Sequence, residues 1–269
     1  MQPLTHPSAS TTPHTLRRKH RRRRRLLRGV LCLCAVIGAV TVWLSTRTSG
    51  ADPVVPDPLA YPVRGIDVSA HNGEIDFTRV AGAGVEFVLI KATEGCDFKD
   101  RAFADNLKRA RAAGLAAGAY HFFRFDRGGY EQALNLLHSV RGRTLDLPLV
   151  IDVEEWANPK FNTTADILTR LQTMVNTLEA HGYDVMLYSN KDGFDRFLGS
   201  RFAHYPLWIC SFTGRPSTSR LRLWQYTHSG RIDGVEGKVD INVYAGSRYE
   251  WEQWLDNLGA INGTGTTLL

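Results

Sequence analysis

Between residues 63 and 244 the chain alternates short apolar segments with segments that carry amphipathic helix signals. Short and almost wholly apolar runs, bounded by turn residues, are typical of strands that are covered on both faces. Eight such runs are expected to be strands: Gly65–Ser69, Phe87–Thr93, Ala116–Phe123, Leu147–Glu154, Val185–Asn190, Leu207–Phe212, Leu221–Thr227 and Val239–Tyr244.

Helix start and stop signals separate the first six of these strands. The expected helices are the segment after Asp76, Arg101–Ala113, Gly129–Val140, Thr163–His181 and Lys191–Leu198. Their Ser, Thr or Asp starts and Gly stops are ordinary caps. The last three strands follow at short spacing without helices. This pattern predicts the α/β class, as an irregular TIM-like barrel with eight strands and about five helices.

The first 62 residues have a different composition. Residues 26–45, LLRGVLCLCAVIGAVTVWLS, carry one charge and follow a run of arginines that ends at Arg25. They predict a transmembrane helix, interpreted as a retained signal-anchor over 26–46 behind a basic cytoplasmic tail, 1–25; a cleaved signal peptide is the alternative. The Pro-rich segment 47–62 is expected to be a linker, 63–258 the barrel and 259–269 a flexible tail. The barrel would then lie outside the cytoplasm, in the periplasm or at the cell surface.

The formal charge of +6 suggests an anionic partner, but it is unevenly distributed. Residues 1–50 hold ten Lys and Arg and no acid, and the rest of the chain holds 23 basic and 27 acidic residues, a net charge of −4. The expected barrel is therefore mildly acidic, which argues against nucleic-acid binding. The adjacent apolar span accounts for the arginine run without a nucleic-acid-binding arm.

Four cysteines are present, and two of them, Cys32 and Cys34, fall in the predicted membrane segment. Cys96 and Cys210 remain for the exported part, either as a disulfide or as two buried free thiols. No CxxC or HExxH motif occurs, so no metal is expected. We also expect no cofactor, and a monomer.

The segment LPLVIDVEEW, residues 147–156, ends an apolar strand in acids. Because side chains alternate along a strand, Asp152 and Glu154 project from one face, and Glu155 from the other. Like charges held this close raise at least one pKa, which supplies a proton donor near neutral pH. The alternative is a pair of solvated acids or partners of Lys and Arg.

Two further acids lie in the first and last strands. Asp67 stands in RGIDVS and Asp240 opens the strand GKVDINVY. Closure of a barrel places its first and last strands side by side, so both acids are expected to join Asp152 and Glu154 at one mouth. The alternative for Asp67 is a buried acid that only accepts hydrogen bonds.

Aromatic residues occur near the same strand ends. Sugar rings present flat C–H faces that pack on aromatic planes, so a carbohydrate cleft is a natural use for them. Most aromatic residues in barrels belong to the core, and two or three of these are expected to face a ligand. The candidates for substrate binding are Tyr120, Phe122, Tyr188, Trp208, Trp224 and Tyr226; Trp156 also lies near these ends.

Taken together, several strings resemble the glycoside hydrolase family 25 lysozymes. They are GIDVSAHNGEIDF, FVLIKATEG, AAGLAAGAYHFF, LPLVIDVEE, VMLYSN, YPLWICSF and LWQYTHSGRIDGVEGKVDIN, from about Arg64 to about Tyr244. The resemblance implies a barrel with eight strands and five helices. It also implies cleavage of the β-1,4 bond between N-acetylmuramic acid and N-acetylglucosamine, with peptidoglycan glycan strands as the partner.

The resemblance also assigns roles. Glu154 matches the family's general acid, Asp152 its partner acid, Asp67 the acid of the opening motif and Asp240 the acid of the closing motif. Two departures are Asn72, where Gln is frequent, and Cys210, where a small residue is common. The expected mechanism is carboxylate acid/base catalysis, with the substrate's acetamido group as a candidate nucleophile positioned by Asp152.

Two other functions fit the sequence less well. A chitinase-like barrel resembles D-x-x-D-x-D-x-E, which would place its first two acids at Leu147 and Val150, and both are apolar. A catalytically silent module that binds the cell wall would show the loss of an acid, whereas all four are present.

Overall fold

The computed structural model describes residues 54–263, in which nine strands are found. They alternate with helices along the first two thirds of this range. Their bounds are β1 (Arg64–Val68), β2 (Phe87–Glu94), β3 (Phe98–Lys99), β4 (Ala116–Phe122), β5 (Leu149–Asp152), β6 (Val185–Asn190), β7 (Leu207–Cys210), β8 (Leu221–Gly230) and β9 (Val239–Tyr244).

Eight of the strands form a closed barrel. Their order is β1-β9-β8-β7-β6-β5-β4-β2, and a parallel pairing of β1 with β2 closes the ring. Only β9 runs antiparallel to its neighbours in the ring, β1 and β8. The predicted barrel and its eight strands are therefore confirmed. β3 is a two-residue strand paired to β2, too short to show a period in the sequence.

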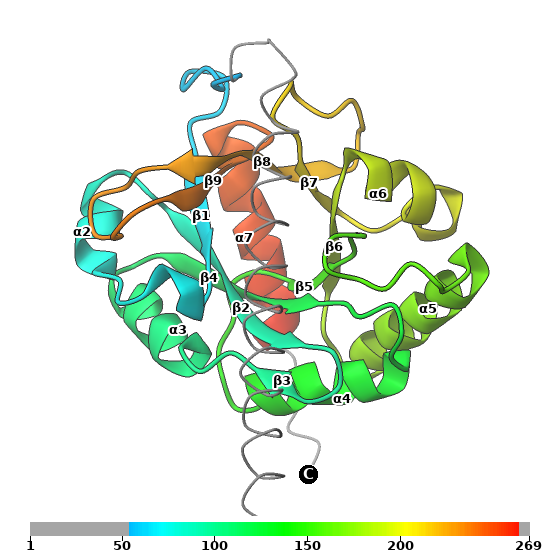
Figure 1. Cartoon of the computed structure of the whole chain (residues 1–269). Helices are drawn as coiled ribbons and strands as arrows, with labels where there is room; N and C mark the ends of the chain where they lie inside the picture. Colours follow the sequence, from blue (N-terminus) through cyan, green and yellow to red (C-terminus); the bar gives the residue numbers. More distant parts are fainter. Residues whose placement is uncertain (1–53, 264–269) are drawn as a thin grey trace, which may run out of the picture. The chain divides into compact units, whose positions relative to one another are not determined.

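Five helices match the predicted ones: α2 (Phe77–Gly82), α3 (Phe103–Ala112), α4 (Gly129–Val140), α5 (Thr164–Ala180) and α6 (Lys191–Phe197). Polar caps start three of them. Asp76 accepts hydrogen bonds from the amides of Thr78 and Arg79, and Thr163 and Asn190 cap α5 and α6 in the same way. Two short 3-10 helices, η1 (Ala70–Asn72) and η2 (Ser200–Phe202), complete the loops. Figure 1 shows that α2 to α6 surround the barrel except along β8 and β9.

A sixth helix, α7 (Arg248–Gly263), was not predicted. In the view of Figure 1 it overlaps the middle of the ring of strands. Trp251 and Trp254 pack with Tyr244, and the ring of Trp251 lies 5.2 Å from that of Phe87, at the amino end of β2. The helix therefore closes the amino end of the barrel. It continues into the segment predicted as a flexible tail, of which residues 264–269 lie outside the described range.

Two hydrophobic clusters hold the barrel together. The first lies between the strands and the outer helices and takes alternate residues of each strand, such as Ile66, Val88 and Ile151. The second fills the interior with the residues between them, including Phe87, Leu89 and Val150. Interior side chains thus fill the amino half of the barrel, and the polar interior residues lie toward the other end.

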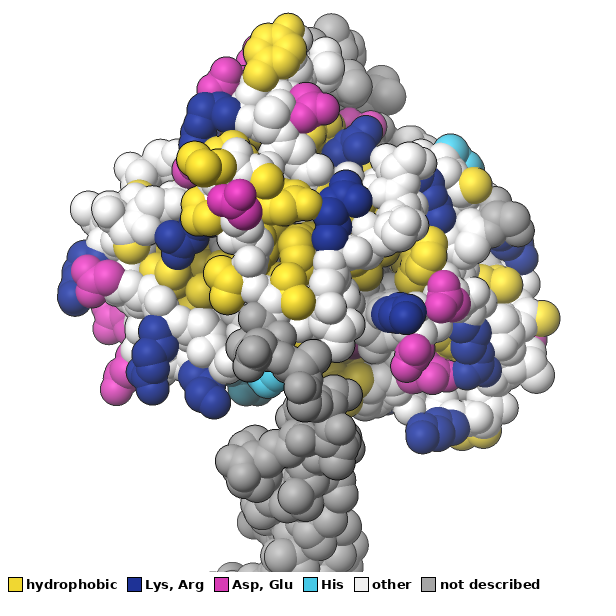
Figure 2. All heavy atoms as spheres, turned by 90° about the horizontal axis from the view of Figure 1, so that it is seen from above, with side chains coloured by type: hydrophobic (Ala, Val, Ile, Leu, Met, Phe, Trp, Pro, Cys, Tyr) yellow, Lys and Arg dark blue, Asp and Glu magenta, His cyan; other side chains and the backbone are white. Residues whose placement is uncertain are grey.

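The outer side of β8 is covered by chain instead of by a helix. Val54 and Tyr61, from the predicted linker, are half-buried against the core, and the Tyr61 ring lies 5.8 Å from the ring of Trp224. Figure 2, seen from above the view of Figure 1, shows hydrophobic side chains gathered on this face among scattered charges. The last residues before β1 are therefore packed on the barrel, and only earlier ones are left for a spacer.

The predicted cytoplasmic tail, the predicted transmembrane helix 26–46 and the first part of the linker lie outside the described residues. Within 54–263, no helix has the length and apolar character needed to cross a membrane. The membrane anchor stays a prediction.

Candidate active site

The four predicted acids meet at one end of the barrel. Asp67 and Asp240 are direct register partners of β1 and β9, and Asp152 is the last residue of β5. Because β9 runs antiparallel to β1, the amino end of β9 lies beside the carboxyl end of β1. This explains how an acid that opens the last strand reaches the mouth at which the parallel strands end.

Asp67 is held by a buried network of hydrogen bonds. Its Oδ2 accepts from Gln225 Nε2 and from Asn242 Nδ2, each at 2.8 Å. Tyr188 donates its hydroxyl to Gln225 Oε1 at 2.9 Å, and Trp208 donates Nε1 to Asn242 Oδ1 at 2.8 Å. Tyr188 and Trp208 thereby fix which end of each amide faces Asp67, so that two N–H donors always point at the carboxylate.

The Asp67 and Asp240 carboxyls have different pKa values. Burial raises the pKa of Asp67 to about 6, although the hydrogen bonds from Asn242 and Gln225 oppose the shift. Burial, followed by the charge of Asp67, raises the pKa of Asp240 to about 8. Asp67 therefore ionises first, and Asp240 keeps a proton near neutral pH.

Glu154 lies close enough to Asp67 for the charge of Asp67 to change its pKa. Burial, and then the charge of Asp67, raise the pKa of Glu154 to about 7, while Lys91 opposes the shift. Burial, and then Glu154, raise the pKa of Asp152 well above its usual value. Asp152 Oδ1 is buried without a hydrogen-bond partner in the described structure. A carboxyl with the pKa of Glu154 can donate a proton near neutral pH, and Asp152 has one oxygen that is free to accept a hydrogen bond.

Lys91 is a site residue that the sequence analysis missed. It lies in β2, two residues after the inward-facing Leu89, and its Nζ is 2.8 Å from Glu94 Oε2. Its charge lowers the pKa values of Asp152 and Glu154 against the effect of burial. The signal was a lysine within the apolar string FVLIKATEG, at a position that alternation places inside the barrel.

Four of the predicted aromatic residues lie on the inner side of the barrel. Tyr188 and Trp208 are in contact, with ring centroids 4.3 Å apart, and Tyr120 packs edge-on against Trp208. Burial raises the pKa of Tyr120 well above its usual value, and the charges of Asp67 and Asp152 add to this. Tyr188 and Trp208 pack beside the acids, because Tyr188 is the register partner of Asp152 and Trp208 is that of Tyr188. Phe122, the register partner of Asp152, lies at the mouth.

Trp224 and Tyr226 are not brought to the acids, and their predicted role in substrate binding is not supported. Gln225, between them, points inward to Asp67, so alternation turns its two neighbours to the outer face of β8. Trp224 is 1% exposed in the outer cluster, and its Nε1 donates to the carbonyl of Ser211. Tyr226 packs against the same cluster.

The two cysteines and Glu155 lie outside the group of four acids. Cys96 and Cys210 are both free and half-buried, so the structure contains no disulfide between them. Burial raises the pKa of the Cys210 thiol far above its usual value. Glu155 is exposed and pairs with Arg196, as expected for a residue on the other face. In residues 54–263 no group of three or more His, Cys, Asp and Glu side chains has the arrangement of a metal site.

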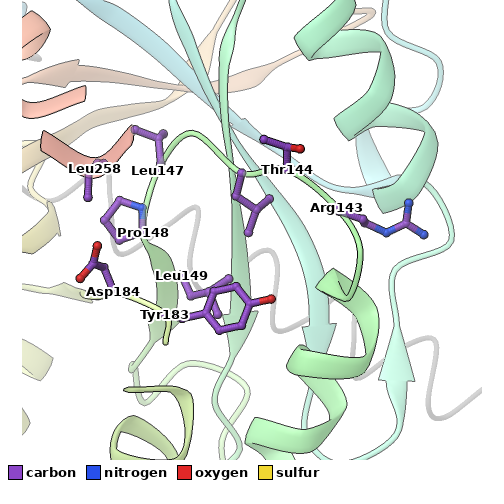
Figure 3. A pocket seen from close by; sticks show the side chains of 9 residues that line it. Arg143, Thr144, Leu147, Pro148, Leu149, Tyr183, Asp184 and Leu258 are labelled. Carbon is purple, nitrogen blue, oxygen red and sulfur yellow. The ribbon is translucent and has the colours of Figure 1, made fainter. Parts of the chain in front are cut away.

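A pocket at the opposite end of the barrel is separate from this site. It has a volume of about 250 Å³ and is lined by residues around the amino end of β5, among them Leu147, Pro148 and Tyr183, and by Leu258 of α7 (Figure 3). The acids lie at the other end of the barrel, where the parallel strands finish. This pocket is therefore not the catalytic one.

Comparison with known proteins decides the family. The family model for glycosyl hydrolases family 25 matches residues 66–235. The chain belongs to this family. It is 34% identical to Lysozyme M1 of Streptomyces globisporus over 206 residues, which are 69% of this chain and 68% of that protein. It is 32% identical to the uncharacterized protein YegX of Escherichia coli K12 over 75% of this chain and 76% of that protein.

Solved structures agree with this assignment. A family 25 glycosyl hydrolase from Bacillus anthracis superimposes with a TM-score of 0.69 at 33% identity, covering 77% of this chain and 98% of that one. A bacterial lysozyme from Streptomyces coelicolor gives a TM-score of 0.64 at 32% identity, with 73% and 98% covered. This family 25 protein is therefore a glycoside hydrolase of the lysozyme type.

Proposed function

We propose that this family 25 enzyme is an N-acetylmuramidase that cleaves the β-1,4 bond between N-acetylmuramic acid and N-acetylglucosamine in peptidoglycan. The observation that carries the proposal is the convergence of four acids, with Glu154 protonated near neutral pH beside Asp67. A protonated carboxyl next to ionisable ones is the arrangement that glycoside hydrolysis requires. Lysozyme M1, to which the chain is similar, carries the same activity in its name.

In the proposed mechanism, Glu154 protonates the glycosidic oxygen while positive charge develops on the sugar. The ionised Asp67 stabilises that charge across the site. Asp152 accepts a hydrogen bond from the N–H of the 2-acetamido group on its unpartnered Oδ1, which directs the acetamido oxygen at the anomeric carbon. As the acetamido oxygen bonds to the anomeric carbon, the glycosidic C–O bond breaks and an oxazolinium ring forms. Glu154, now a carboxylate, takes a proton from a water molecule that attacks the anomeric carbon and opens this ring, so the configuration at the anomeric carbon is retained overall.

A catalytically silent wall-binding module is not favoured by this geometry. Such a module would gain nothing from burying four carboxyls together, because the burial of like charges is costly unless protons neutralise them. The raised pKa values of Asp67, Asp152 and Glu154 show that this cost of burial is present in the site. Buried carboxyls with raised pKa values are better explained by a catalytic role than by binding alone.

The decisive variant is Glu154→Gln, with Glu155→Gln as its matched control. Glu155 is the next residue but is exposed and paired with Arg196. The full chain is incubated with purified peptidoglycan, and the new reducing ends are identified. We expect new N-acetylmuramic acid ends from the parent and from Glu155→Gln, and at least a ~100-fold lower rate from Glu154→Gln.

The same digests test the mechanism. The anomer of the first product is followed by NMR, and net inversion would rule out the acetamido route. Cleavage by Glu154→Gln at the rate of the parent would show that another residue is the acid.

We also infer that residues 26–46 anchor the enzyme in the cell membrane, with the barrel on the extracytoplasmic side. The support is in the sequence: an apolar segment follows the basic run 17–25, and that order favours a cytoplasmic amino terminus. A monomeric enzyme would suffice, because all four acids come from one chain.

A further inference from the structure

Three aromatic rings form a strip at the mouth of the barrel beside the acids. Phe98 comes from β3, Phe122 from the end of β4, and Trp156 from the loop after β5. Lys91 Nζ lies between the first two, 5.4 Å from the centre of the Phe98 ring and 5.2 Å from that of Phe122. The rings of Phe122 and Trp156 meet edge-on, with centroids 6.3 Å apart. The strip thus follows the carboxyl ends of β2, β4 and β5.

Two members of the strip are open to solvent. Trp156 is 64% exposed and Phe98 is 48% exposed, whereas Phe122 is buried beneath them. Single exposed aromatic residues are common, but these two are linked through Phe122 and Lys91 beside the acids, and together they form a patch that a ligand can cover. Polar groups border the patch, because Glu94 and Arg124 lie 3.6 Å apart beside Lys91 and are both partly exposed.

Hydrogen bonds hold the backbone of the loop that carries Trp156. Asn158 is buried; it accepts from the amide of Phe125 and donates to the carbonyls of Phe123 and Glu154, at 2.8 to 2.9 Å. Arg124 donates to the carbonyl of Ala157 at 2.7 Å.

Ala157 itself has a φ of 57°, the only non-glycine residue with positive φ in the described range. An alanine in this region of backbone space is strained, and the surrounding hydrogen bonds keep it there. The backbone that carries Trp156 is therefore held in place before any ligand arrives, which lowers the entropy cost of ordering the loop on binding.

We propose that Trp156 and Phe98, with Phe122 beneath, form a subsite for one N-acetylated pyranose ring of the glycan strand. This inference rests on the proposed muramidase function and specifies where the strand lies. Trp156 is two residues from Glu154, and Phe122 is the register partner of Asp152, so a ring on the strip adjoins the cleaved bond. The C–H face of a pyranose suits the indole, and Glu94 and Arg124 are placed to bind its hydroxyl groups.

The test compares binding without cleavage. In the full chain carrying Glu154→Gln, the affinity for soluble glycan strands, freed of their peptides by an amidase, is measured by calorimetry. Adding Trp156→Ala is expected to weaken binding about tenfold, and Trp156→Phe much less, because a ring remains. Phe161→Ala is the matched control, since Phe161 is 78% exposed on the same loop but makes no aromatic contact in the described structure. Its affinity should not change.

Kinetics in the otherwise unchanged enzyme give an independent readout. Trp156→Ala should raise KM while the melting temperature stays that of the parent, because the indole is exposed. Equal affinity of Trp156→Ala and Phe161→Ala would overturn the subsite. If the parent released no N-acetylmuramic acid ends, the muramidase proposal would fail. The binding comparison would still decide whether the aromatic strip binds a sugar ring.

Discussion

At the scale of single residues, the site is governed by which carboxyl holds a proton. Asp67 faces two fixed amide donors and Asp240 faces Asp67, so adjacent residues of one strand pair have pKa values of about 6 and about 8. The pKa of Glu154, about 7, lies between these two values. Burial raises the pKa of all three groups, and the differences come from hydrogen bonds to Asp67 and from the charge of Asp67 on Asp240 and Glu154.

The pKa of Asp240 predicts a pH-dependent stability. Its value is about 8 in the folded state against about 4 for an unfolded aspartate, so the folded state binds the extra proton between these values. The stability contributed by this proton is complete below about pH 4 and is lost as the pH rises through about 8. Asp240→Asn removes this dependence and keeps a donor for Asp67. Its melting temperature relative to the parent should therefore be higher at pH 9 than at pH 5, by on the order of a few degrees.

Melting curves of the full chain at the two pH values check this. Asp256→Asn, at an exposed position of α7, is the control and should show no such change between the two pH values. A pH-independent difference for Asp240→Asn would mean that Asp240 is already ionised at pH 5.

At the scale of secondary structure, close approach between α4 and α5 is made possible by a glycine. A Cβ on Gly129, the first residue of α4, would clash with the backbone carbonyl oxygen of Arg170 in α5. Backbone cannot move aside as a flexible side chain can. Gly129→Ala should therefore lower the free energy of unfolding by about 1–3 kcal/mol, measured by urea denaturation.

Gly82→Ala gives the matched comparison. Gly82 ends α2, and an added Cβ there would have no neighbour within 4 Å. It should be neutral or stabilising by up to about 1 kcal/mol, because alanine has fewer unfolded conformations to lose. The same cost at both positions would contradict the packing argument.

At the scale of the whole molecule, the chain divides into two units, residues 1–52 and 53–269. If residues 26–46 anchor the enzyme, the full chain should sediment with membranes and resist extraction at alkaline pH. A chain that lacks residues 1–46 should appear in the soluble fraction and still cleave peptidoglycan, because every acid of the site belongs to the second unit. Release of the full chain by alkaline washing would argue against a spanning anchor.

Sequence alone determined where the eight barrel strands and five of the helices lie along the chain, and which four acids they carry toward one end of the barrel. Each of these depends on local signals: apolar runs, capping residues, and charged residues placed inside strands. The helical character of α7 could have been recognised in the sequence, since Trp251, Trp254, Leu255 and Leu258 recur at helical spacing, but its position across the amino end of the barrel could not.

Only the tertiary structure decided which face of each strand meets the acids. Trp224 and Tyr226 resemble Trp208 and Tyr188 in the sequence, yet β8 turns them outward because Gln225 takes the inward position. The pairing of Asp67 with Asp240 likewise depends on the antiparallel direction of β9. The pKa values follow from burial and from partners more than 150 residues away, such as Gln225 and Asn242 for Asp67. Local sequence encodes periodicity, whereas these contacts exist only once the barrel has closed.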